Sequence, residues 1–535
     1  MIKKIPYTVK HYIALILYSF LVMLLCTKSS PIYVLNDWYD ANVYYTMGRG
    51  LVNGAVLYKE LFDHKGPFLY LIYAIGYLIS NNNFFGVFIL QVIAMSITLI
   101  CSFQIARLYT SNDKASFMIS ILMPVSILTS NFYVSGRDLG GGSPDEFVIP
   151  IFLLIMYLVV RLIKCDILLE KPFITFFSIG ILSSLIFQLK FTYLSLVIGL
   201  LAPIFVYMLV KKFVIFIKSS LLFCGGFILT LIPYLTYSLI TNSLRDFLQV
   251  YIKFNKVYAS KEGKNLIYSL AVASRNAVNT MLGRNMLIFV IIFLGLLYFL
   301  YSHKDEFIFN LSVILSFALS IIVVSIVPFE YGYINIMAFS LLGYISLYEI
   351  INKLGKQLNT NNTSKYPYSM GIYITSLLII FCFTIANNGL VCEDLNKITH
   401  RNVRMSCQKE VAEIVYSDGN EEHSLLEVLN LDSGFYTALG IIPKSRYFYI
   451  PNAPFYKYPY AYIGQYEDVK SRLNEYVISP FEANYKEEIE LQPMNSENCH
   501  EKITNAIAMN YSLVKTIQGT YLQGNTTFYL YRRLD

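Results

Sequence analysis

Apolar residues fill repeated long runs of the chain, and polar residues collect in a few short stretches between these runs. A helix needs about 20 mainly apolar residues to cross a bilayer. Windows of that kind predict about eleven membrane spans, with edges uncertain by several residues: roughly 11–27, 84–107, 115–134, 145–162, 173–189, 194–211, 219–241, 285–302, 307–327, 333–352 and 370–388. Residues 68–80 are apolar but short for a span, and they predict a juxtamembrane or partly inserted helix, with a twelfth span as the alternative.

The pattern changes after residue 388, where charged residues become denser and turn sequences appear. Short β-like runs at 424–429 and 527–531 alternate there with helical ones. The fold class predicted is an all-α polytopic membrane protein with a small α/β C-terminal domain. We expect the membrane domain at 1–388 and the C-terminal domain at 389–535, either as part of the chemistry or as a cap that only packs on the membrane part.

Composition supports the membrane assignment. Hydrophobic residues make up 56% of the chain and charged residues 14%, with a mean hydropathy of +0.51; soluble domains carry about 25% charged residues. The net charge of +7 is modest, and no basic domain interleaved with aromatics is present, so we expect no nucleic-acid partner. Cys392, Cys407 and Cys499 fall in the C-terminal part and allow at most one disulfide, whose pairing the sequence does not specify.

Lysine and arginine in the loops predict the orientation of the spans. Cytoplasmic loops carry an excess of these residues. With Lys3, Lys4 and Lys10 inside, most basic clusters fall on the cytoplasmic side, and no small-residue cleavage site follows, so we expect a retained first span rather than a signal peptide. The outer side then receives the loops 28–83, 133–146 and 242–284 and the C-terminal domain, which predicts a multi-pass cell-membrane protein with an extracytoplasmic C-terminus.

Two of these outer loops carry carboxylates. The first holds Asp37, Asp40, Glu60 and Asp63, together with Trp38, the only tryptophan, which we expect to anchor at the membrane interface. The second holds three consecutive glycines followed by the acidic pair Asp145 and Glu146. Carboxylates at a membrane interface must be hydrated, paired or functional, because burying their charge is costly. For the acidic pair, capping of the next helix is the alternative to a functional role.

The third outer loop, 242–284, is basic. Its charged residues are Arg245, Lys253, Lys256, Lys261, Lys264, Arg275 and Arg284 against Asp246 and Glu262. One interpretation is a pair of interfacial amphipathic helices whose cations reach lipid headgroups. The other is a surface that receives an anionic, phosphate-bearing substrate.

The first loop resembles a known family. Its pattern is an acidic residue after the first span (Asp40), aromatics a few positions later, glycines near the end of a short helix, and the turn Lys65-Gly66-Pro67 before an apolar helix. This pattern is similar to the first outer loop of GT-C-fold glycosyltransferases, which include the dolichyl-phosphate-mannose protein mannosyltransferases and the bacterial aminoarabinose transferases; a bacterial member fits best. Two departures stand out: Gly66 replaces a frequent proline, and 328–333 lacks the Arg and His of some members.

The resemblance implies a GT-C-like fold and transfer of a sugar from a polyprenyl-phosphate donor to an acceptor hydroxyl, by inverting single displacement on the outer face. It implies Asp40 as general base, with Asp37 as the nearest competitor. Cations would bind the leaving phosphate, so the substrate-binding candidates are Lys65 first, then Arg137 and Lys190, with Asp63 and His64 beside Lys65.

Other roles stay open at this point. His64 is a second base or a solvated turn residue. Asp145 and Glu146 would position the acceptor, or hold a divalent metal ion with Asp40; no cofactor is certain. The sugar is unspecified, and the acceptor is a glycan, a lipid or a protein. The alternative functions are a non-enzymatic carrier or flippase of lipid-linked sugars in the membrane, and a polysaccharide polymerase or ligase.

Overall fold

The computed structural model describes residues 7–33, 36, 38–110, 112–130, 140–259, 266–283, 285–326, 330–358, 370–388, 391, 406–419, 422–521 and 524–534. Asp37, Arg137 and Cys392 lie outside these residues. The chain forms two compact units, which we describe separately: unit 1 comprises 1–32, 88–233 and 261–395, and unit 2 comprises 33–87, 234–260 and 396–535. This division follows packing, and the predicted functional domains 1–388 and 389–535 stay predictions.

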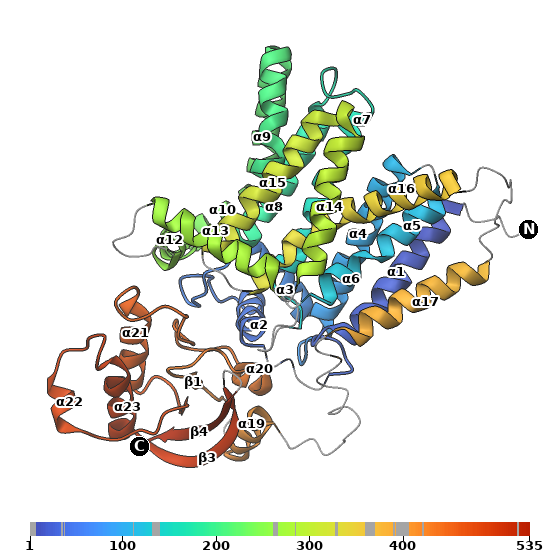
Figure 1. Cartoon of the computed structure of the whole chain (residues 1–535). Coiled ribbons are helices and arrows are strands. Elements are labelled where there is room, and N and C mark those ends of the chain that lie inside the picture. The colour runs from blue at the N-terminus through green and yellow to red at the C-terminus, as the bar shows by residue number, and fades with distance from the viewer. Residues whose placement is uncertain are drawn as a thin grey trace, which may run out of the picture. The chain divides into compact units, whose positions relative to one another are not determined.

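Unit 1 is helical throughout its described part (Figure 1). Its helices are α1 (Tyr7–Cys26), most of α4 (Phe85–Tyr109), α5 (Asp113–Ile121), α6 (Met123–Leu128), α7 (Pro144–Lys164), α8 (Phe173–Leu189), η1 (Phe191–Tyr193), α9 (Leu194–Lys211), most of α10 (Phe213–Ile240), α13 (Leu266–Leu282), α14 (Met286–Ser302), η3 (Lys304–Glu306), α15 (Phe307–Ile326), η4 (Glu330–Phe339), α16 (Ser340–Leu358) and α17 (Met370–Ala386).

Seven of the described helical stretches are long and apolar enough to cross a membrane: Val9–Cys26, Phe85–Tyr109, Pro144–Lys164, Phe191–Lys211, Phe213–Ile240, Lys304–Ile326 and Tyr331–Leu354. The bent pair Ile267–Leu282 and Met286–Ser302 would be an eighth. Helices α8 and α17 are apolar but have 17 residues each. A polytopic helical membrane protein is therefore confirmed, and the number of eleven spans stays a prediction.

The span predicted at 115–134 is wrong as a single helix. The chain forms two short helices there, α5 with nine residues and α6 with six, which meet at Leu122. Pro124 lies in the first turn of α6. Proline lacks a backbone N–H and its ring clashes with the preceding turn, so it begins a helix readily but interrupts a continuing one.

Helices in unit 1 pack through small and hydroxyl-bearing residues. Helices α9 and α15 lie against each other, and the Ser316 hydroxyl of α15 donates to the Leu196 carbonyl of α9 at 2.6 Å. Helices α14 and α16 form a second pair, at which Tyr298 donates to Glu349 at 3.0 Å. Small residues and interhelical hydrogen bonds are typical of helix contacts in membranes, where apolar burial alone does not drive association.

Unit 2 gathers three separated parts of the chain. The first part forms α2 (Tyr39–Val52) and α3 (Pro67–Ile79), the short apolar helix predicted there. The second part continues α10 into α11 (Leu244–Phe247), the π-helical turn η2 (Leu248–Phe254) and α12 (Asn255–Ala259). The 242–284 segment is thus helical in its described part, as predicted, while its role as a lipid or substrate surface stays a prediction.

The third part of unit 2 is the predicted small α/β domain. Its elements are α19 (Cys407–Ser417), β1 (Leu425–Glu427), α20 (Phe435–Leu439), α21 (Pro459–Lys470), β2 (Tyr476–Ser479), α22 (Glu487–Leu491), α23 (Cys499–Asn510), β3 (Tyr511–Tyr521) and β4 (Gly524–Arg533). The strands lie in the order β1-β2-β4-β3, with β1 parallel to β2 and the other pairs antiparallel. Both predicted β-like runs are therefore strands, β1 and β4.

The sheet and its helices enclose one core. Leu426 of β1 pairs with Val477 of β2, which pairs with Tyr531 of β4, and all three side chains are buried. Ile503 and Ile507 of α23, four residues apart on one helix face, lie in the same core. This core holds in place the loops between β1 and β2, which reach the candidate site within unit 2.

Candidate active site

Asp40 lies in the first turn of α2, where the helix dipole favours a negative charge. Tyr44 follows four residues later on the same helix face, and its hydroxyl donates to the Asp40 carboxylate at 3.1 Å. The Asp40 side chain is partly exposed. Trp38, just before the helix, is only 5% exposed and packs its ring edge-to-face with Tyr44. The prediction that Trp38 anchors at the membrane interface is therefore wrong, because it is buried within the protein.

Helices α2 and α3 approach closely at Gly48. A Cβ atom at this position would lie 2.7 Å from the backbone nitrogen of Ala74, so only glycine fits this crossing. Helix α3 begins with Pro67 in its first turn, a position that suits proline. Gly66 before it has φ −79° and ψ 156°, a backbone conformation that proline also adopts. The departure from the family pattern at Gly66 therefore leaves the geometry of the turn unchanged.

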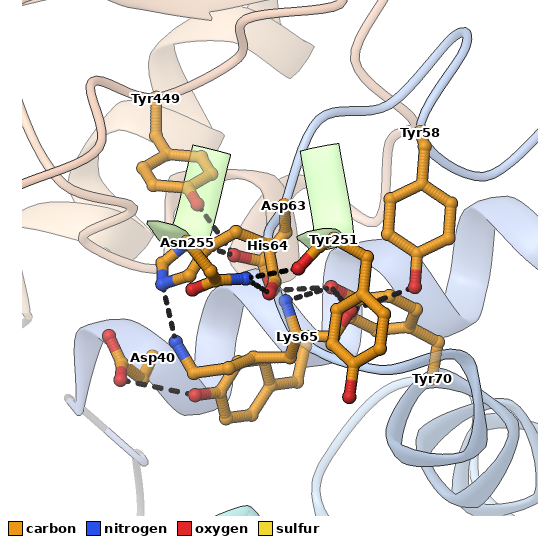
Figure 2. A network of polar contacts seen from close by, with 10 residues as sticks. Asp40, Tyr58, Asp63, His64, Lys65, Tyr70, Tyr251, Asn255 and Tyr449 are labelled. Atoms are coloured by element: carbon orange, nitrogen blue, oxygen red, sulfur yellow. Dashed lines mark hydrogen bonds and ion pairs between the residues drawn. The ribbon is translucent and has the colours of Figure 1, made fainter. Parts of the chain in front are cut away.

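Asp63 lies at the centre of a buried network (Figure 2) and is 1% exposed. Its carboxylate accepts hydrogen bonds from Tyr70 of α3 at 2.8 Å and from Tyr449 of the C-terminal part at 2.7 Å. Burial disfavours the charged form of Asp63, but the neighbouring His64, the positive charge of Lys65 and the hydrogen bond from Tyr449 outweigh burial, so the pKa is held well below its usual range. Asp63 is therefore a carboxylate.

His64 and Lys65 continue this network. Nδ1 of His64 lies 3.3 Å from Asp63 Oδ1, and Nε2 lies 3.0 Å from the Lys65 amine. Burial, and then the charge of Lys65, lower the pKa of His64. The Lys65 amine also lies 5.8 Å from the centre of the Tyr44 ring, whose hydroxyl binds Asp40. His64 is 16% exposed at its side chain, which excludes the prediction of a solvated turn residue.

The turn that carries Lys65 is fixed from several sides. Its backbone carbonyl accepts from the Tyr58 hydroxyl at 2.8 Å, and its backbone N–H donates to the Tyr70 hydroxyl at 2.9 Å. Asn255 of α12 donates to the His64 carbonyl at 2.7 Å. Tyr58 itself has φ +65°, a left-handed conformation that bulky residues rarely adopt and that clusters at functional sites.

Lys65 is the residue of this cluster that indicates most clearly what the site can bind. It is 6% exposed, and within the described chain its amine contacts the imidazole of His64 and no carboxylate within 4 Å. A buried cation is costly unless an opposite charge compensates it. The arrangement can therefore accept an anion at Lys65, whose amine lies 5.8 Å from the ring of Tyr44, the tyrosine that donates to Asp40.

The second acidic loop lies in unit 1 and begins α7. Ser143 is the N-cap residue, and its hydroxyl accepts from the Glu146 backbone at 3.3 Å. The Glu146 carboxylate reaches back to the Gly142 N–H at 2.7 Å and accepts from Gln91 of α4 at 3.0 Å. Gly141 and Gly142 have φ near +90°, which glycine adopts without strain. This reciprocal arrangement resembles a capping box, except that Glu146 accepts from the residue before the N-cap, so Glu146 has a structural role, and its substrate role stays a prediction.

Asp145 and Lys190 meet in the same unit. Lys190, between α8 and η1, places its amine 3.9 Å from Asp145 Oδ2. The same amine donates to the Tyr193 hydroxyl at 2.8 Å and lies 4.7 Å from the centre of that ring. Asp145 is fully buried, whereas the Lys190 side chain is 24% exposed. An acid and a cation predicted separately thus form one pair.

The predicted site residues therefore fall into two groups. Asp40, Asp63, His64 and Lys65 gather in unit 2, and Asp145, Glu146 and Lys190 gather in unit 1. Asp37 and Arg137 lie outside the described residues. In the part of the chain that the structure describes, no three His, Cys, Asp or Glu side chains could hold a metal ion, so no described set with Asp40, Asp145 or Glu146 forms the metal site considered from sequence.

Sequence reasoning missed the tyrosines of this site and Gln91. Tyr44 had a usable signal, because it follows Asp40 by four residues on a helix. Nothing in the sequence pointed to Tyr70 or Tyr449, because no spacing rule links a tyrosine hydroxyl to a carboxylate in another segment. Gln91 stands within a predicted span, where a lone amide signals only that it needs a hydrogen-bond partner.

Comparison with known proteins supports the resemblance seen in the first loop. Residues 64–239 match the family model described as dolichyl-phosphate-mannose-protein mannosyltransferase. This range includes Lys65 and Lys190 and both acids of the second loop. Among curated protein sequences, none matches the chain significantly.

Among solved structures, the chain is similar to ArnT from Cupriavidus metallidurans bound to undecaprenyl phosphate, with 13% identity, a TM-score of 0.60 and 98% of both chains covered. It is also similar to ArnT from the same organism in the apo state, with 11% identity, a TM-score of 0.57, and 98% of this chain and 97% of that chain covered. At such low identity the likeness shows the fold. The chain is therefore a multi-pass membrane protein with the GT-C-like fold of ArnT, and its residues 64–239 resemble the dolichyl-phosphate-mannose-protein mannosyltransferase family.

Proposed function

We propose that the chain is a membrane glycosyltransferase that moves a sugar from a polyprenyl-phosphate donor to an acceptor hydroxyl on the outer face of the membrane. The family model that matches 64–239 and the fold shared with ArnT support the transferase class. The structure of ArnT bound to undecaprenyl phosphate supports a lipid phosphate as the donor's leaving group.

In the proposed reaction, the acceptor oxygen attacks the anomeric carbon of the sugar and forms the new glycosidic bond. The bond between that carbon and the phosphate oxygen breaks, and its electron pair leaves with the lipid phosphate. The proton of the acceptor hydroxyl passes to the Asp40 carboxylate, which acts as general base. This single displacement inverts the configuration at the anomeric carbon.

Lys65 is the observation that carries the proposal. The leaving group gains one negative charge when it departs, so a fixed cation stabilises the transition state more than the ground state. Lys65 is buried, positively charged, held by its backbone on both sides, and contacted at its amine by a neutral imidazole. A phosphate is the anion that this position would receive.

The unit 1 pair has a proposed secondary role. Asp145 and Lys190 would bind hydroxyl groups of the acceptor or of the sugar, because a carboxylate accepts hydrogen bonds and an ammonium donates them. The basic residues of the 242–284 segment would attract the anionic donor to the membrane surface. These roles affect binding rather than the transfer step.

Purified protein with a panel of polyprenyl-phosphate sugars and candidate acceptors tests the proposal. We expect transfer in the wild type and a loss of roughly a hundredfold or more in kcat for Asp40→Asn, because positioned general bases contribute about 10²–10⁴-fold. Glu60→Gln is the matched control: Glu60 is an acid of the same loop, and it caps a local turn at Val56. Normal turnover in Asp40→Asn contradicts the role of Asp40.

Two further outcomes separate the alternatives. Lipid-linked sugar that crosses liposome membranes without any transfer by the wild-type protein would favour a carrier or flippase. Activity with diphosphate-linked oligosaccharides and none with monophosphate donors would favour a polymerase or ligase. An inverted anomeric configuration in the product, measured by NMR, supports single displacement, whereas retention contradicts it.

A further inference from the structure

The contact between His64 and Lys65 fixes the protonation of the imidazole. A lysine ammonium carries three N–H donors and no acceptor. Since it lies 3.0 Å from His64 Nε2, that nitrogen must offer its lone pair and carry no proton. The proton of the neutral ring therefore lies on Nδ1.

Nδ1 faces the correct partner for that tautomer. It lies 3.3 Å from Oδ1 of Asp63, a carboxylate that also accepts hydrogen bonds from the hydroxyls of Tyr70 and Tyr449. The ring packs against Phe254 at 5.2 Å between ring centres, and Asn255 holds the His64 backbone. The lowered pKa of His64, caused by burial and by Lys65, agrees with a neutral ring.

The result is an oriented chain from Asp63 through His64 to Lys65 (Figure 2). We infer that His64 is a positioning residue for Lys65: it accepts one ammonium N–H and thereby directs the other two toward the donor phosphate. A lysine side chain has several rotatable bonds and loses considerable rotamer freedom when fixed. Asp63 acts on Lys65 only through His64, because its carboxylate selects the His64 tautomer that carries the proton on Nδ1.

A neutral acceptor suits this task better than a carboxylate would. A carboxylate in direct contact would neutralise more of the Lys65 charge before the substrate arrives, whereas imidazole fixes the direction of the ammonium and adds no negative charge of its own. Asp63, the nearby carboxylate, instead accepts hydrogen bonds from Tyr70 and Tyr449 and lies 3.3 Å from Nδ1 of His64. This inference rests on the proposed function, in which Lys65 binds the leaving phosphate.

Two amide substitutions of His64 test it, because they differ by one methylene. His64→Asn keeps a donor near the Nδ1 position for Asp63 but places no atom at Nε2. His64→Gln reaches the Nε2 position with an acceptor oxygen. We expect His64→Asn to lower kcat/KM for the donor by roughly tenfold or more, the usual weight of a hydrogen bond to a charged group, and His64→Gln to stay within about threefold of wild type.

The two variants His64→Asn and His64→Gln are then also made in a protein that carries Lys65→Met. We expect the effect of His64→Asn to vanish there, both in transfer and in binding of undecaprenyl phosphate to the purified protein, since His64 acts through Lys65. A purely structural role of His64 would instead lower activity equally in both backgrounds, and equal activity of the Asn and Gln variants would overturn the inference. If Lys65→Met itself transfers sugar normally, the proposed role of Lys65 fails, which is a distinct result.

Discussion

In its described part, unit 2 contains two sites of buried carboxyl groups that differ in charge. One is Asp63, described above. The other is the pair formed by Glu427, the last residue of β1, and Asp432 in the loop before α20, both 0% exposed. Asp432 accepts from the Thr46 hydroxyl of α2 at 3.1 Å and from the Gly434 N–H at 2.9 Å. Glu427 accepts from the Ser433 N–H at 3.1 Å and from Asn430.

Burial alone does not decide the charge of these groups. It raises the pKa of Asp432 to about 7 and that of Glu427 well above its usual range, and the nearness of Asp432 raises the pKa of Glu427 further, so the pair holds protons to higher pH than ordinary carboxyl groups do. Asp63 is equally buried, yet His64 and Lys65 keep its pKa low. The charge of Arg49 acts to lower the pKa of Asp432 but does not outweigh burial, and Nη1 of Arg49 donates to the carbonyls of Tyr436 and Ile441.

This difference in charge distinguishes a site that can bind a ligand, at Asp63, from one that supports the fold, at Glu427 and Asp432. The pair and Arg49 join α2 to the C-terminal part within unit 2 through hydrogen bonds with Thr46, Tyr436 and Ile441. The Asp63 network instead ends at the Lys65 ammonium, which contacts the imidazole of His64 and has no carboxylate within 4 Å in the described part of the chain. A buried carboxylate that stays charged beside a lysine therefore points to the ligand site, and a carboxyl pair with raised pKa values points to an internal support.

The largest expected effect comes from removing the negative charge of Asp63. Asp63→Asn removes the charge that Tyr449, Tyr70 and His64 all contact. We expect a destabilisation of about 3 kcal/mol, the scale seen when one partner of a buried charged network is lost. We also expect donor kcat/KM to fall at least tenfold. Thermal unfolding in detergent and the transfer assay measure both quantities.

Asp432→Asn is the matched control, because it also replaces a fully buried aspartate by its amide. Since burial raises the pKa of Asp432 and so favours its neutral form, we expect a change within about 1 kcal/mol and unchanged transfer. Equal destabilisation by the two substitutions would contradict the assignment of opposite charge states.

The pH dependence of stability gives a smaller effect with opposite signs at the two sites. The folded-state pKa of Asp63 is depressed, so its stabilisation is present above the unfolded pKa of about 3.9 and is lost as the pH falls through the folded value. The pKa values of Glu427 and Asp432 are raised, so their stabilisation is complete below about pH 4 and is lost as the pH rises through the folded values. Between pH 5 and 8 the pair should therefore contribute a slope, whereas Asp63 should not.

Unfolding temperatures from pH 5 to 8 test this sign. The wild type should lose stability through this pair as the pH rises, and Asp432→Asn should flatten the decline. A variant that declines as steeply as the wild type would show that the pair is already ionised at pH 5.

Local patterns in the sequence predicted those features of the fold and of the candidate site that depend on residues close together in the chain. The helical spans, the two predicted strands, the acid at the start of α2 and the Lys65 turn before Pro67 all follow from periodicity, composition or neighbouring residues. The break at Leu122 was also readable from Pro124, although the apolar run concealed it. In each case the relevant residues lie within a few positions of one another.

The rest depends on contacts between segments far apart in the sequence. Tyr449 is 386 residues from Asp63, and Thr46 is 386 residues from Asp432. Trp38 looked like an interface residue because amphipathic aromatics favour that location, and only tertiary packing against Tyr44 reverses the expectation. The charge states of the buried carboxyl groups likewise depend on which cation the fold brings near.

The smallest expected effect compares single hydroxyl groups at the two sites. Tyr449→Phe removes a hydrogen bond to a charged carboxylate, and Thr46→Val removes one to a carboxyl group whose raised pKa favours its neutral form. Hydrogen bonds to charged groups contribute about 1.5–3 kcal/mol and neutral ones about 0.5–1.5 kcal/mol. Thermal unfolding should therefore show the larger loss for Tyr449→Phe, which also shifts the acid-induced loss of stability to higher pH because it weakens the stabilisation of the Asp63 charge. Thr46→Val could instead lower the unfolding temperature as much as Tyr449→Phe and shift the acid-induced loss of stability to higher pH in the same way. That result would mean that Asp432 carries a full charge, and the contrast between the charged Asp63 site and a neutral supporting pair would no longer hold.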